Sequence, residues 1–474
     1  MSNKAFLYLH IHPLAPKDCL PLHERFSGLQ HKLHSLLLDS AGSSANENQY
    51  SFMLWEPEHL VTQQCGRTVV HNIKEKQKSV SRADPLAVAD SLLQEFKQNI
   101  VPVNYDSVPD NLPFQTGLAG LVGYDVARSY VKSIHSESHD KTDYATADVI
   151  IGLYSNGIIH CHQTNKQYYC CINNQPNTYS YNSDNLPAPS SDNNNEFALT
   201  SPWRSNLTEQ QYHDAIDRIH RYLVEGDCYQ TNFSQRFSAN YSGSLFNAYL
   251  ALRDTNKSPF SAYLVTPHGA VLSVSPERFL SVKNNMVETR PIKGTRPRSG
   301  DKQEDDASAN ALLNSEKDKA ENLMIVDLLR NDLSKHCEPN SVDVPHLFSL
   351  ESYEAVHHMV SVVTGVLKPQ STPLMLLKDA FPGGSITGAP KVRAMEIIEE
   401  LEPHKRNVYC GSIFYNGWQN DMDSSICIRT LVAENGSIYC CAGGGIVIDS
   451  KASEEYKETF DKVAKIVPHL VSNE

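Results

Sequence analysis

Apolar side chains at helical spacing predict helices in the second half of the chain. The clearest helix runs from Thr208 to Gly226, because Thr208 and Gln211 have capping-box spacing and a glycine ends the apolar pattern. Residues 317–333 and 453–467 are also predicted to be helical, with few helix breakers. Residues three apart in these segments share one helical face.

Strand patterns lie before and between these helices. Residues 270–282 predict two strands joined by a turn at Pro276, and residues 413–418, 424–432 and 437–448 predict three more. The first residues of the chain also favour a strand. Helices and strands follow each other without a regular βαβ rhythm, so an α+β class with antiparallel sheets is favoured over a doubly wound fold.

The chain changes character near residue 200. Residues 173–204 are rich in Asn, Ser and Pro, and we expect them to form a mobile surface connection. This connection divides a strand-rich N-terminal region, 1–172, from a region at 205–474 that carries the candidate chemistry. We expect strands from both regions to share sheets, with the active site lined almost wholly by residues after 205.

The composition is that of a globular protein with an acidic balance. The chain has 474 residues, with 42 Lys and Arg against 55 Asp and Glu, giving a formal net charge of −13. Such a chain is a poor general nucleic-acid binder, because binding phosphates requires positive charge. No apolar run approaches the ~18 residues of a membrane helix. We therefore expect neither nucleic acid nor a membrane as a partner.

The cysteines favour a reducing, cytoplasmic location. Eleven are present, an odd number, and no CxxC pair occurs, so neither a disulfide framework nor a zinc ribbon fits. His160, Cys161 and His162 are adjacent, but they lie in an alternating segment whose neighbouring side chains point to opposite faces. A metal site there is disfavoured.

A repeated carboxylate spacing indicates a cation site. Asp318 and Glu321 are three residues apart on one predicted helix, and Glu455 and Glu458 are three apart on another. If the helices face each other, four carboxylates converge and need a cation between them. Oxygen ligands of this kind suit Mg²⁺. The alternative interpretation is two solvated acidic faces.

A lysine in a stiff, basic segment is a candidate nucleophile. Lys293 lies in TRPIKGTRP, near Arg290 and Arg296. Burial and nearby cations lower a lysine pKa and favour the neutral, nucleophilic amine. Glu277, in the turn SPERF, is a candidate acid–base companion. The alternative is a surface lysine in a basic loop.

Two glycine-rich segments are candidate anion sites. Residues 382–391 read PGGSITGAPK and residues 441–446 read CAGGGI. Gly383 to Gly388 has the GxxxxG spacing of a P-loop, but Ala389 stands where the lysine is needed, and neither segment fits GxGxxG. With Lys391 and Arg429 available, small carboxylates are more plausible ligands than nucleotides. The alternative is that both segments are tight turns.

Ordered motifs after residue 205 resemble those of the chorismate-utilising enzymes. The matching blocks include SPERF, RPIKGT, KDKAENLMIVDLLRNDL, HHMVS, FPGGSITGAPKVRAM, YCGSIFY, YCCAGGGIVIDS and EEYKET. The first half matches less strongly, through LLLDSA and PFQTGLAGLVGYD. The resemblance implies the fold of that family, a large antiparallel β-sandwich core wrapped by helices.

One residue distinguishes branches of this family. Anthranilate synthases generally read PIAGT, whereas the aminodeoxychorismate synthases that form a covalent enzyme intermediate read PIKGT, and this chain has Lys293 there. The resemblance therefore implies aminodeoxychorismate synthase component I, in the para-aminobenzoate branch of folate synthesis. Anthranilate synthase component I is the alternative. A pyridoxal-phosphate enzyme and a catalytically inactive binding partner are disfavoured.

The resemblance also implies roles for individual residues. Lys293 attacks C2 of chorismate, Glu277 protonates the hydroxide that leaves C4, and ammonia then displaces the lysine. Mg²⁺ is implied as cofactor, held by Glu321 and Glu458 with Asp318 and Glu455 beside it. The family's active-site histidine corresponds to His358. Positions that hold the substrate correspond to Thr387, Arg429, Tyr439, Gly443, Gly444 and Gly445.

Two further partners are implied by the family. The chain contains no glutaminase nucleophile loop of the GxCxGxQ kind, so a separate glutamine amidotransferase subunit is expected to supply ammonia. Some family members also hold L-tryptophan in a pocket of the N-terminal region. The corresponding residues here are Ser40, Tyr50, Ser51, Phe52, Pro259, Phe260 and Ser261.

Overall fold

The computed structural model describes most of the chain. The described residues are 6–40, 49–103, 109, 112–131, 133–134, 144–176, 183–190, 195–352 and 356–466. The expected mobile connection at 173–204 therefore lies partly outside the described residues. Within its described part, β12 (Ala198–Leu199) and β13 (Arg204–Ser205) pair with the long strand β14 (Gln230–Ser242).

The larger of two sheets has 14 strands in the described part of the chain. It begins with β12 and β14. Two short strands of two residues each, β13 and β22 (Gly388–Ala389), also pair with β14. The order continues through β26 (Ser437–Ile446), β25 (Thr430–Glu434), β16 (Gly269–Ser275), β15 (Phe260–Thr266), β2 (Leu36–Asp39), β3 (Tyr50–Leu54), β10 (Asn156–Cys161), β11 (Lys166–Asn173), β1 (Leu7–Pro13) and β7 (Ile100–Pro102).

The second sheet has 12 strands among the described residues, and it positions the candidate nucleophile. Its edge strand β19 (Ile292–Pro297) pairs with β21 (Val356–Val366), which also pairs with β20 (Asp343–Ser352). The order continues through β18 (Met286–Thr289), β17 (Arg278–Lys283), β24 (Met422–Ile426), β23 (Ser412–Gly417), β8 (Gly117–Val122), β9 (Val149–Tyr154), β4 (His59–Gln64), β5 (Arg67–Asn72) and β6 (Gln77–Ser81).

Both sheets contain strands from both halves of the sequence. In the larger sheet β2 pairs with β15, and in the second sheet β8 pairs with β23. β1 and β7 are parallel, and every other pairing between described strands is antiparallel. The largest buried apolar cluster takes side chains from both sheets. The α+β prediction, with antiparallel sheets forming the core, is confirmed.

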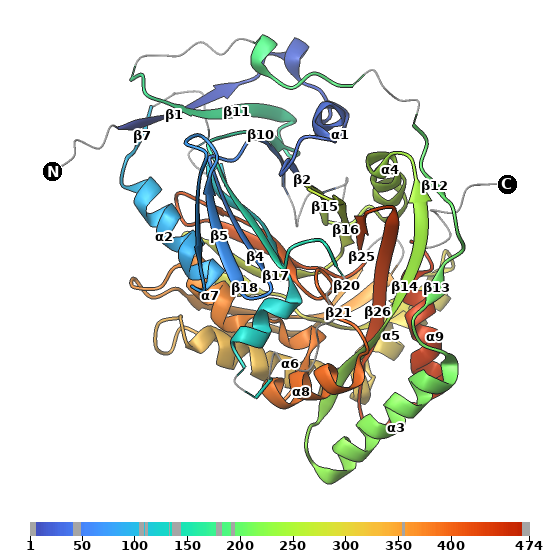
Figure 1. Ribbon diagram of the computed structural model, residues 1–474. Helices are drawn as coiled ribbons and strands as arrows, with labels where there is room; N and C mark the ends of the chain where they lie inside the picture. Colours follow the sequence, from blue (N-terminus) through green and yellow to red (C-terminus); the bar gives the residue numbers. More distant parts are fainter. Residues whose placement is uncertain are drawn as a thin grey trace.

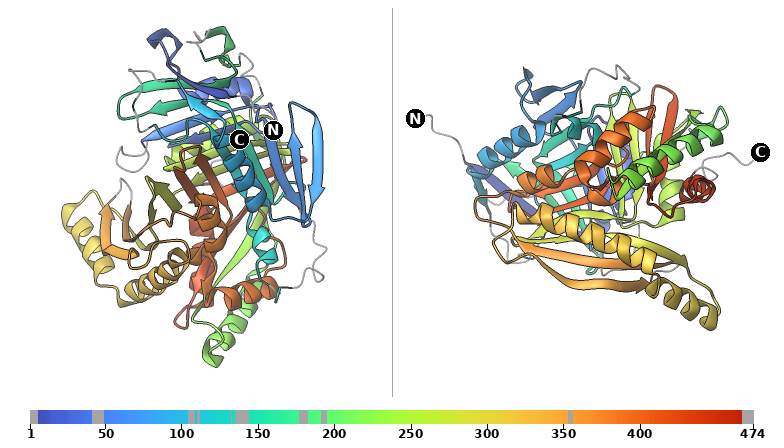
Figure 2. Two further views of the ribbon diagram at one scale, coloured as in Figure 1. Left: turned by 90° about the vertical axis from the view of Figure 1, so that its left-hand side faces the viewer. Right: turned by 90° about the horizontal axis from the view of Figure 1, so that it is seen from below.

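Helices cover the outside of these sheets (Figure 1). α2 contacts β8 and β9, whose residues are all buried. Figure 2 shows α5 and α6, in yellow, running beside the long orange strands β20 and β21. The helices are α1 (Leu22–Phe26), α2 (Pro85–Lys97), α3 (Glu209–Glu225), α4 (Leu245–Asn256), α5 (Lys302–Leu313), α6 (Glu316–Ser334), α7 (Pro373–Ala380), α8 (Lys391–Leu401) and α9 (Ala452–Val463).

The helix predictions are confirmed with small changes at the ends. α3 begins with the complete capping box of Thr208 and Gln211 and ends at Gly226, which has a φ of 82°. α6 agrees with the prediction within a residue at each end, and α9 ends at Val463, before the predicted end. Among the described residues, none of these helices combines the length and the apolar character needed to cross a bilayer.

One strand prediction is wrong in a way that matters for the site. Residues 424–432 do not form a single strand, because β24 ends at Ile426 and β25 begins at Thr430. Between them Arg429 has a φ of 50°, a left-handed conformation that is uncommon for a residue with a side chain. The break separates the two sheets and leaves Arg429 at a cavity.

Candidate active site

A cavity of about 690 Å³ lies beside the edge strand of the second sheet. Its walls come from β19, α6, β26 and α9, together with a loop around Ser385. Every lining residue lies at or after Asn232. The structure thus brings the candidate lysine and both carboxylate pairs of the second half to one cavity.

A β-bulge directs Lys293 into this cavity. The pairing of β19 with β21 shifts register between Ile292 and Thr295, so the strand gains one residue at Lys293–Gly294. Gly294 has a φ of 80°, and a Cβ atom there would lie 2.9 Å from Cγ of Asp318. Glycine is therefore required after the lysine for both backbone conformation and space.

The surroundings of Lys293 favour a neutral amine more than water does. Burial lowers the pKa of Lys293, and the Glu321 and Glu277 carboxylates oppose that shift. Its Nζ donates a hydrogen bond to the backbone carbonyl of Ser385 at 3.3 Å. A lysine held this way has the electrostatic setting expected of a nucleophile.

Glu277 lies at the turn between β16 and β17 and is buried. Burial raises the pKa of its carboxyl group, and the nearby Lys293 opposes the shift. Its Oε1 accepts a hydrogen bond from Oγ of Ser385 at 3.0 Å. A carboxyl group with a raised pKa beside an amine can serve as a general acid.

His358 lies on β21 and lines the same cavity. Burial lowers its pKa to about 4, with a contribution from the Arg429 guanidinium. Its Nδ1 lies 2.9 Å from Oγ1 of Thr295, across the β19–β21 pair. The imidazole is therefore neutral near pH 7, and it can orient groups by hydrogen bonding but cannot serve there as a cationic acid.

All four predicted carboxylates line the cavity from two helices, α6 and α9. Asp318 makes an ion pair with Arg296 at 2.9 Å, and Glu458 makes one with Lys462 at 2.6 Å. Oγ of Ser450 donates to Glu455 at 2.6 Å. Burial raises the pKa values of Glu321 and Glu455, and neighbouring carboxylates add to both shifts.

These carboxylates fit a cation that is shared with a bound ligand. A Cβ atom at Gly444 would lie 3.0 Å from Oε2 of Glu455 and 3.5 Å from Oε1 of Glu458, so both carboxylates approach the glycine strand. Among the described residues, no three acidic, His or Cys side chains are already grouped to hold a metal ion. Mg²⁺ commonly takes one or two carboxylates and completes its coordination with water and substrate.

Three glycines of β26, Gly443, Gly444 and Gly445, line the cavity beside the carboxylates of α9. At Gly443 a Cβ atom would overlap the backbone oxygen of Phe233, so at this position β26 lies too close to β14 for a residue with a side chain. Nζ of Lys462 donates to the carbonyl of Gly443 at 2.9 Å. This wall presents backbone groups to the cavity.

Two predicted substrate-binding residues do not line the cavity. Thr387 is fully buried, and its Oγ1 donates to the backbone oxygen of Gly383 at 2.9 Å. Tyr439 precedes Gly443 by four residues along β26, roughly 13 Å of strand. Its ring packs edge-on against Tyr144 instead.

The cavity is lined by a tyrosine that the sequence analysis missed. Tyr409 lies at the end of the segment that leads into β23, and it is buried against the cavity. The guanidinium of Arg406 lies 5.7 Å from its ring centroid. The motif YCGSIFY marks this segment, but only the folded chain shows that its first tyrosine reaches the site.

Lys391 was expected to help bind an anion, and this expectation is wrong. Its Nζ makes an ion pair with the buried carboxylate of Asp332 at 2.6 Å and donates to the carbonyl of Ala380 at 2.8 Å. The lysine therefore fixes the start of α8 against α6. The positive charge at the cavity comes from residues such as Lys293, Arg296, Arg429 and Lys462.

A smaller cavity of about 60 Å³ lies between the two sheets. It brings together six of the seven residues proposed for tryptophan: Ser40, Tyr50, Phe52, Pro259, Phe260 and Ser261. Ser51 faces an adjacent cavity of about 330 Å³, because successive strand residues point to opposite faces. Its Oγ accepts a hydrogen bond from the backbone N–H of Ser40 at 3.1 Å.

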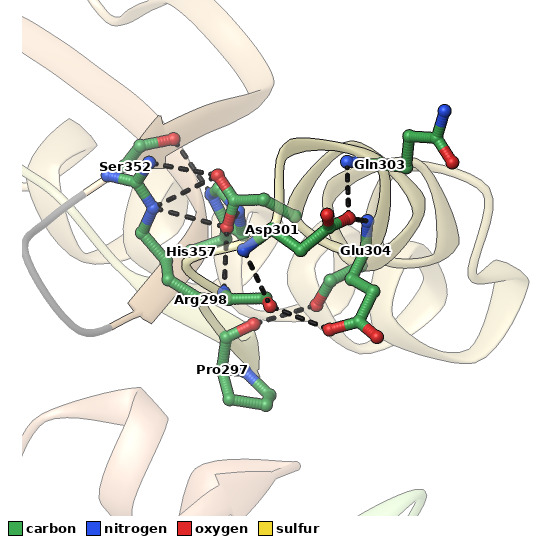
Figure 3. A network of polar contacts seen from close by, with 10 residues as sticks. Pro297, Arg298, Asp301, Gln303, Glu304, Ser352 and His357 are labelled. Carbon is green, nitrogen blue, oxygen red and sulfur yellow. Dashed lines mark hydrogen bonds and ion pairs between the residues drawn. The ribbon is translucent and has the colours of Figure 1, made fainter.

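Figure 3 shows the polar network that holds α5 beside the end of β19, the strand that carries the candidate nucleophile. Arg298, which follows β19, makes an ion pair with Asp305 of α5 at 2.9 Å and lowers the pKa of Asp305 to about 2. Nε2 of His357 lies 3.0 Å from the same carboxylate, and its Nδ1 lies 2.8 Å from Oγ of Ser352. The buried residue of α5, Leu312, lies near the end of the helix. The start of α5 is therefore anchored by these polar contacts and not by apolar packing.

The sequence matches the chorismate binding enzyme family over residues 37–468. The chain belongs to this family. It is 44% identical to aminodeoxychorismate synthase component 1 of Escherichia coli (strain K12), over 94% of this chain and 95% of the relative. It is 33% identical to anthranilate synthase component 1 of Aquifex aeolicus (strain VF5), over 91% of this chain and 88% of the relative.

A solved structure agrees with the fold. The crystal structure of anthranilate synthase component I from Streptococcus pneumoniae TIGR4 covers 90% of this chain and 93% of its own, with a TM-score of 0.75 and 30% identity. The predictions of the family and of its fold are confirmed. The choice of the aminodeoxychorismate synthase branch is also confirmed, because relatives with that name are more similar than the anthranilate synthases.

Proposed function

We propose that this chain converts chorismate and ammonia into 4-amino-4-deoxychorismate through a covalent bond to Lys293. The observation that carries the proposal is the β-bulge that presents Lys293 to the cavity, within reach of the same loop residue that contacts Glu277. This lysine distinguishes the chain from anthranilate synthases, which generally have alanine at that position.

In the first step, the neutral amine of Lys293 forms a bond to C2 of chorismate. The two ring double bonds shift, the C4–O bond breaks, and Glu277 gives its proton to the departing hydroxyl group, which leaves as water. Glu277 becomes a carboxylate. The environment suits this exchange, because burial lowers the pKa of Lys293 and raises that of Glu277.

In the second step, ammonia forms a bond to C4, the double bonds shift back, and the C2–Nζ bond breaks to release Lys293. The proton lost from the incoming nitrogen can return to Glu277, which restores the acid. His358 is neutral, and its hydrogen bonding suits it to orient substrate rather than to supply a proton near pH 7.

Binding of a dianionic substrate requires positive charge and backbone donors. Arg429 and the Gly443–Gly445 strand line the cavity and suit the carboxylates of chorismate. Glu321 and Glu458, with Asp318 and Glu455 beside them, would hold Mg²⁺. The ion would neutralise the ring carboxylate and orient it.

The direct test is to identify the product of chorismate and ammonium, with and without Mg²⁺. We expect 4-amino-4-deoxychorismate, formed only with the metal, and no fluorescent anthranilate.

Lys293→Ala should lose most of the rate, by about 100-fold or more, while still binding chorismate. Lys335→Ala, on the end of α6 and outside the cavity lining, is the matched lysine control. Anthranilate as product, or near-full activity of Lys293→Ala, would refute the proposal.

A separate glutamine amidotransferase is proposed as the source of ammonia in the cell. The sequence contains no recognisable glutaminase nucleophile loop. We expect the purified chain to use ammonium but not glutamine, and to use glutamine once an amidotransferase subunit is added. The check is product formation from chorismate, Mg²⁺ and glutamine with ammonium rigorously removed. Turnover there at the ammonium-driven rate would show that the chain releases ammonia itself.

Tryptophan binding and a cytoplasmic location stay predictions. The small cavity between the sheets is lined by aromatic and serine side chains that suit an indole and an amino acid group, and at about 60 Å³ it must widen to admit tryptophan. Isothermal titration of the purified chain with L-tryptophan, against Phe52→Ala as a comparison, tests the site. No heat of binding to the wild-type chain would remove tryptophan from the proposal.

A further inference from the structure

A rigid loop carries Ser385 between the proposed nucleophile and the proposed acid. Ser385 is the middle residue of a short 3₁₀ turn, Gly384–Ile386. A Cβ atom at Gly384 would overlap the side chain of Leu328, so the turn is packed directly on α6. On its other side, the buried Arg406 donates to the carbonyl of Ile386 at 2.9 Å.

Ser385 contacts both reacting groups through different atoms. Its hydroxyl donates to Oε1 of Glu277 at 3.0 Å, and its backbone carbonyl accepts from Nζ of Lys293 at 3.3 Å. Asn232 approaches the same carbonyl with its Nδ2 at 3.4 Å. Ser385 and Asn232 both line the cavity. The separation of acid and nucleophile is thus set through one residue of a fixed loop.

We propose that Ser385 is a positioning residue that orients Glu277 for proton donation and Lys293 for attack. The inference rests on the proposed function. The carbonyl holds one N–H of the lysine, which leaves the nitrogen lone pair free to face the substrate. The hydroxyl holds Oε1 of Glu277, which leaves the other carboxyl oxygen to carry the proton toward the leaving group.

The hydroxyl has a further effect when the proton moves. As the C4–O bond breaks, the proton of Glu277 passes to the leaving oxygen, water departs, and a carboxylate remains. Ser385 already donates to that carboxylate, so the new charge is stabilised without rearrangement. The hydrogen bond also favours the ionised form of Glu277, and its loss raises the pKa of the acid.

Other charged groups that face Glu277 stay in place when the hydroxyl is removed. They are Lys293 on β19, Lys462 on α9 and Arg429 between β24 and β25, and the Cys410 thiol lies near the same carboxyl. All three cations lower the pKa of Glu277. A change in the titration of Glu277 in a Ser385 variant is therefore a change in this one hydrogen bond.

The test measures the rate from chorismate against pH, at constant free ammonia, for the wild type, Ser385→Ala and Ser385→Thr. Activity requires protonated Glu277, so it falls as the pH rises through the pKa of this acid. Ser385→Ala should lower kcat by about 10-fold, with a smaller change in KM for chorismate, and should move the alkaline fall upward by about one pH unit. Ser385→Thr keeps a hydroxyl and should restore most of both properties.

Thr146→Val is the matched control. Oγ1 of Thr146 donates to the buried carboxylate of Glu434 at 2.7 Å, outside the cavity lining, so this variant loses a similar hydrogen bond elsewhere. It should keep the wild-type pH profile. A Ser385→Ala enzyme with unchanged kcat, or with a rate lowered equally at every pH, would overturn the inference, and so would the same alkaline shift in Thr146→Val. If the wild type itself makes no aminodeoxychorismate, the proposed function fails first and the inference falls with it.

Discussion

The charged residues of the cavity are held where water cannot screen them fully. Burial lowers the pKa values of Lys293 and Arg429 and raises that of Glu277, so each group is moved toward its neutral form. Electrostatic interactions strengthen in such surroundings. A chain with a net charge of −13 can therefore bind an anionic substrate, because its positive charge is concentrated locally.

We expect different effects on KM from replacing Tyr409 and Tyr439 by phenylalanine. Tyr409→Phe removes a hydroxyl from a residue that lines the cavity, and we expect KM for chorismate to rise by about 10-fold, the effect of one hydrogen bond to a charged group. Tyr439→Phe, whose ring packs on Tyr144, should change KM by less than about twofold. Steady-state kinetics with ammonia measure both. A larger rise in KM for Tyr439→Phe than for Tyr409→Phe would show that Tyr439 binds substrate, as the family resemblance implies.

These residues show what the sequence can and cannot supply. Lys293 and Glu277 were identifiable because each lies in a short motif whose chemistry is specific. Tyr439 was assigned from a motif that does reach the site, through Gly443, but a strand carries residues four apart to different places. Ser385 lies in the glycine-rich segment 382–391, which the sequence marks as a candidate anion site, but its contacts with Glu277 and Lys293 depend on partners that are distant in sequence.

Irregularities in the strands bring Lys293 and Arg429 to the cavity. The bulge at Lys293–Gly294 turns a residue of the edge strand into the cavity, and the break between β24 and β25 presents Arg429. Apolar alternation predicted the strands but not these interruptions, since Cys427 and Ile428 continue the apolar pattern. Bulges and breaks depend on pairing with distant strands, which local patterns do not contain.

Gly294→Ala tests the bulge. The substituted residue would need a left-handed conformation and would press on Leu312 and Asp318, so we expect a loss of about 1–3 kcal/mol in the free energy of unfolding. A small displacement of Lys293 should lower kcat/KM by about 100-fold. Thermal unfolding and ammonia-dependent kinetics measure the two effects.

Gly300→Ala is the control for this change. It lies in the loop after the same strand, and a Cβ atom there meets nothing within 4 Å. Its stability and kinetics should match the wild type. If Gly294→Ala also behaves like the wild type, the bulge does not set the position of the lysine.

At the scale of the whole molecule, the N-terminal region supports a site that it does not line. Its strands continue both sheets, through β2 beside β15 and β8 beside β23. The cavity residues nevertheless all lie at or after Asn232. The sequence predicted this division, because strand patterns occur in both halves while the chemical motifs occur in one.

A fragment of residues 203–474 should therefore not fold on its own. Removing the N-terminal region would expose the backbone edges of β15 and β23 and uncover apolar side chains such as Leu264 and Phe414, which are now buried. Exposed strand edges and apolar faces promote aggregation. We expect insoluble protein from the fragment expressed alone, and partial recovery of soluble, active protein when residues 1–202 are coexpressed as a separate chain. Solubility and cooperative thermal unfolding, compared with the full chain, provide the measurement. A soluble fragment that unfolds cooperatively would show that the second half is an independent domain and that the shared sheets are not required for its fold.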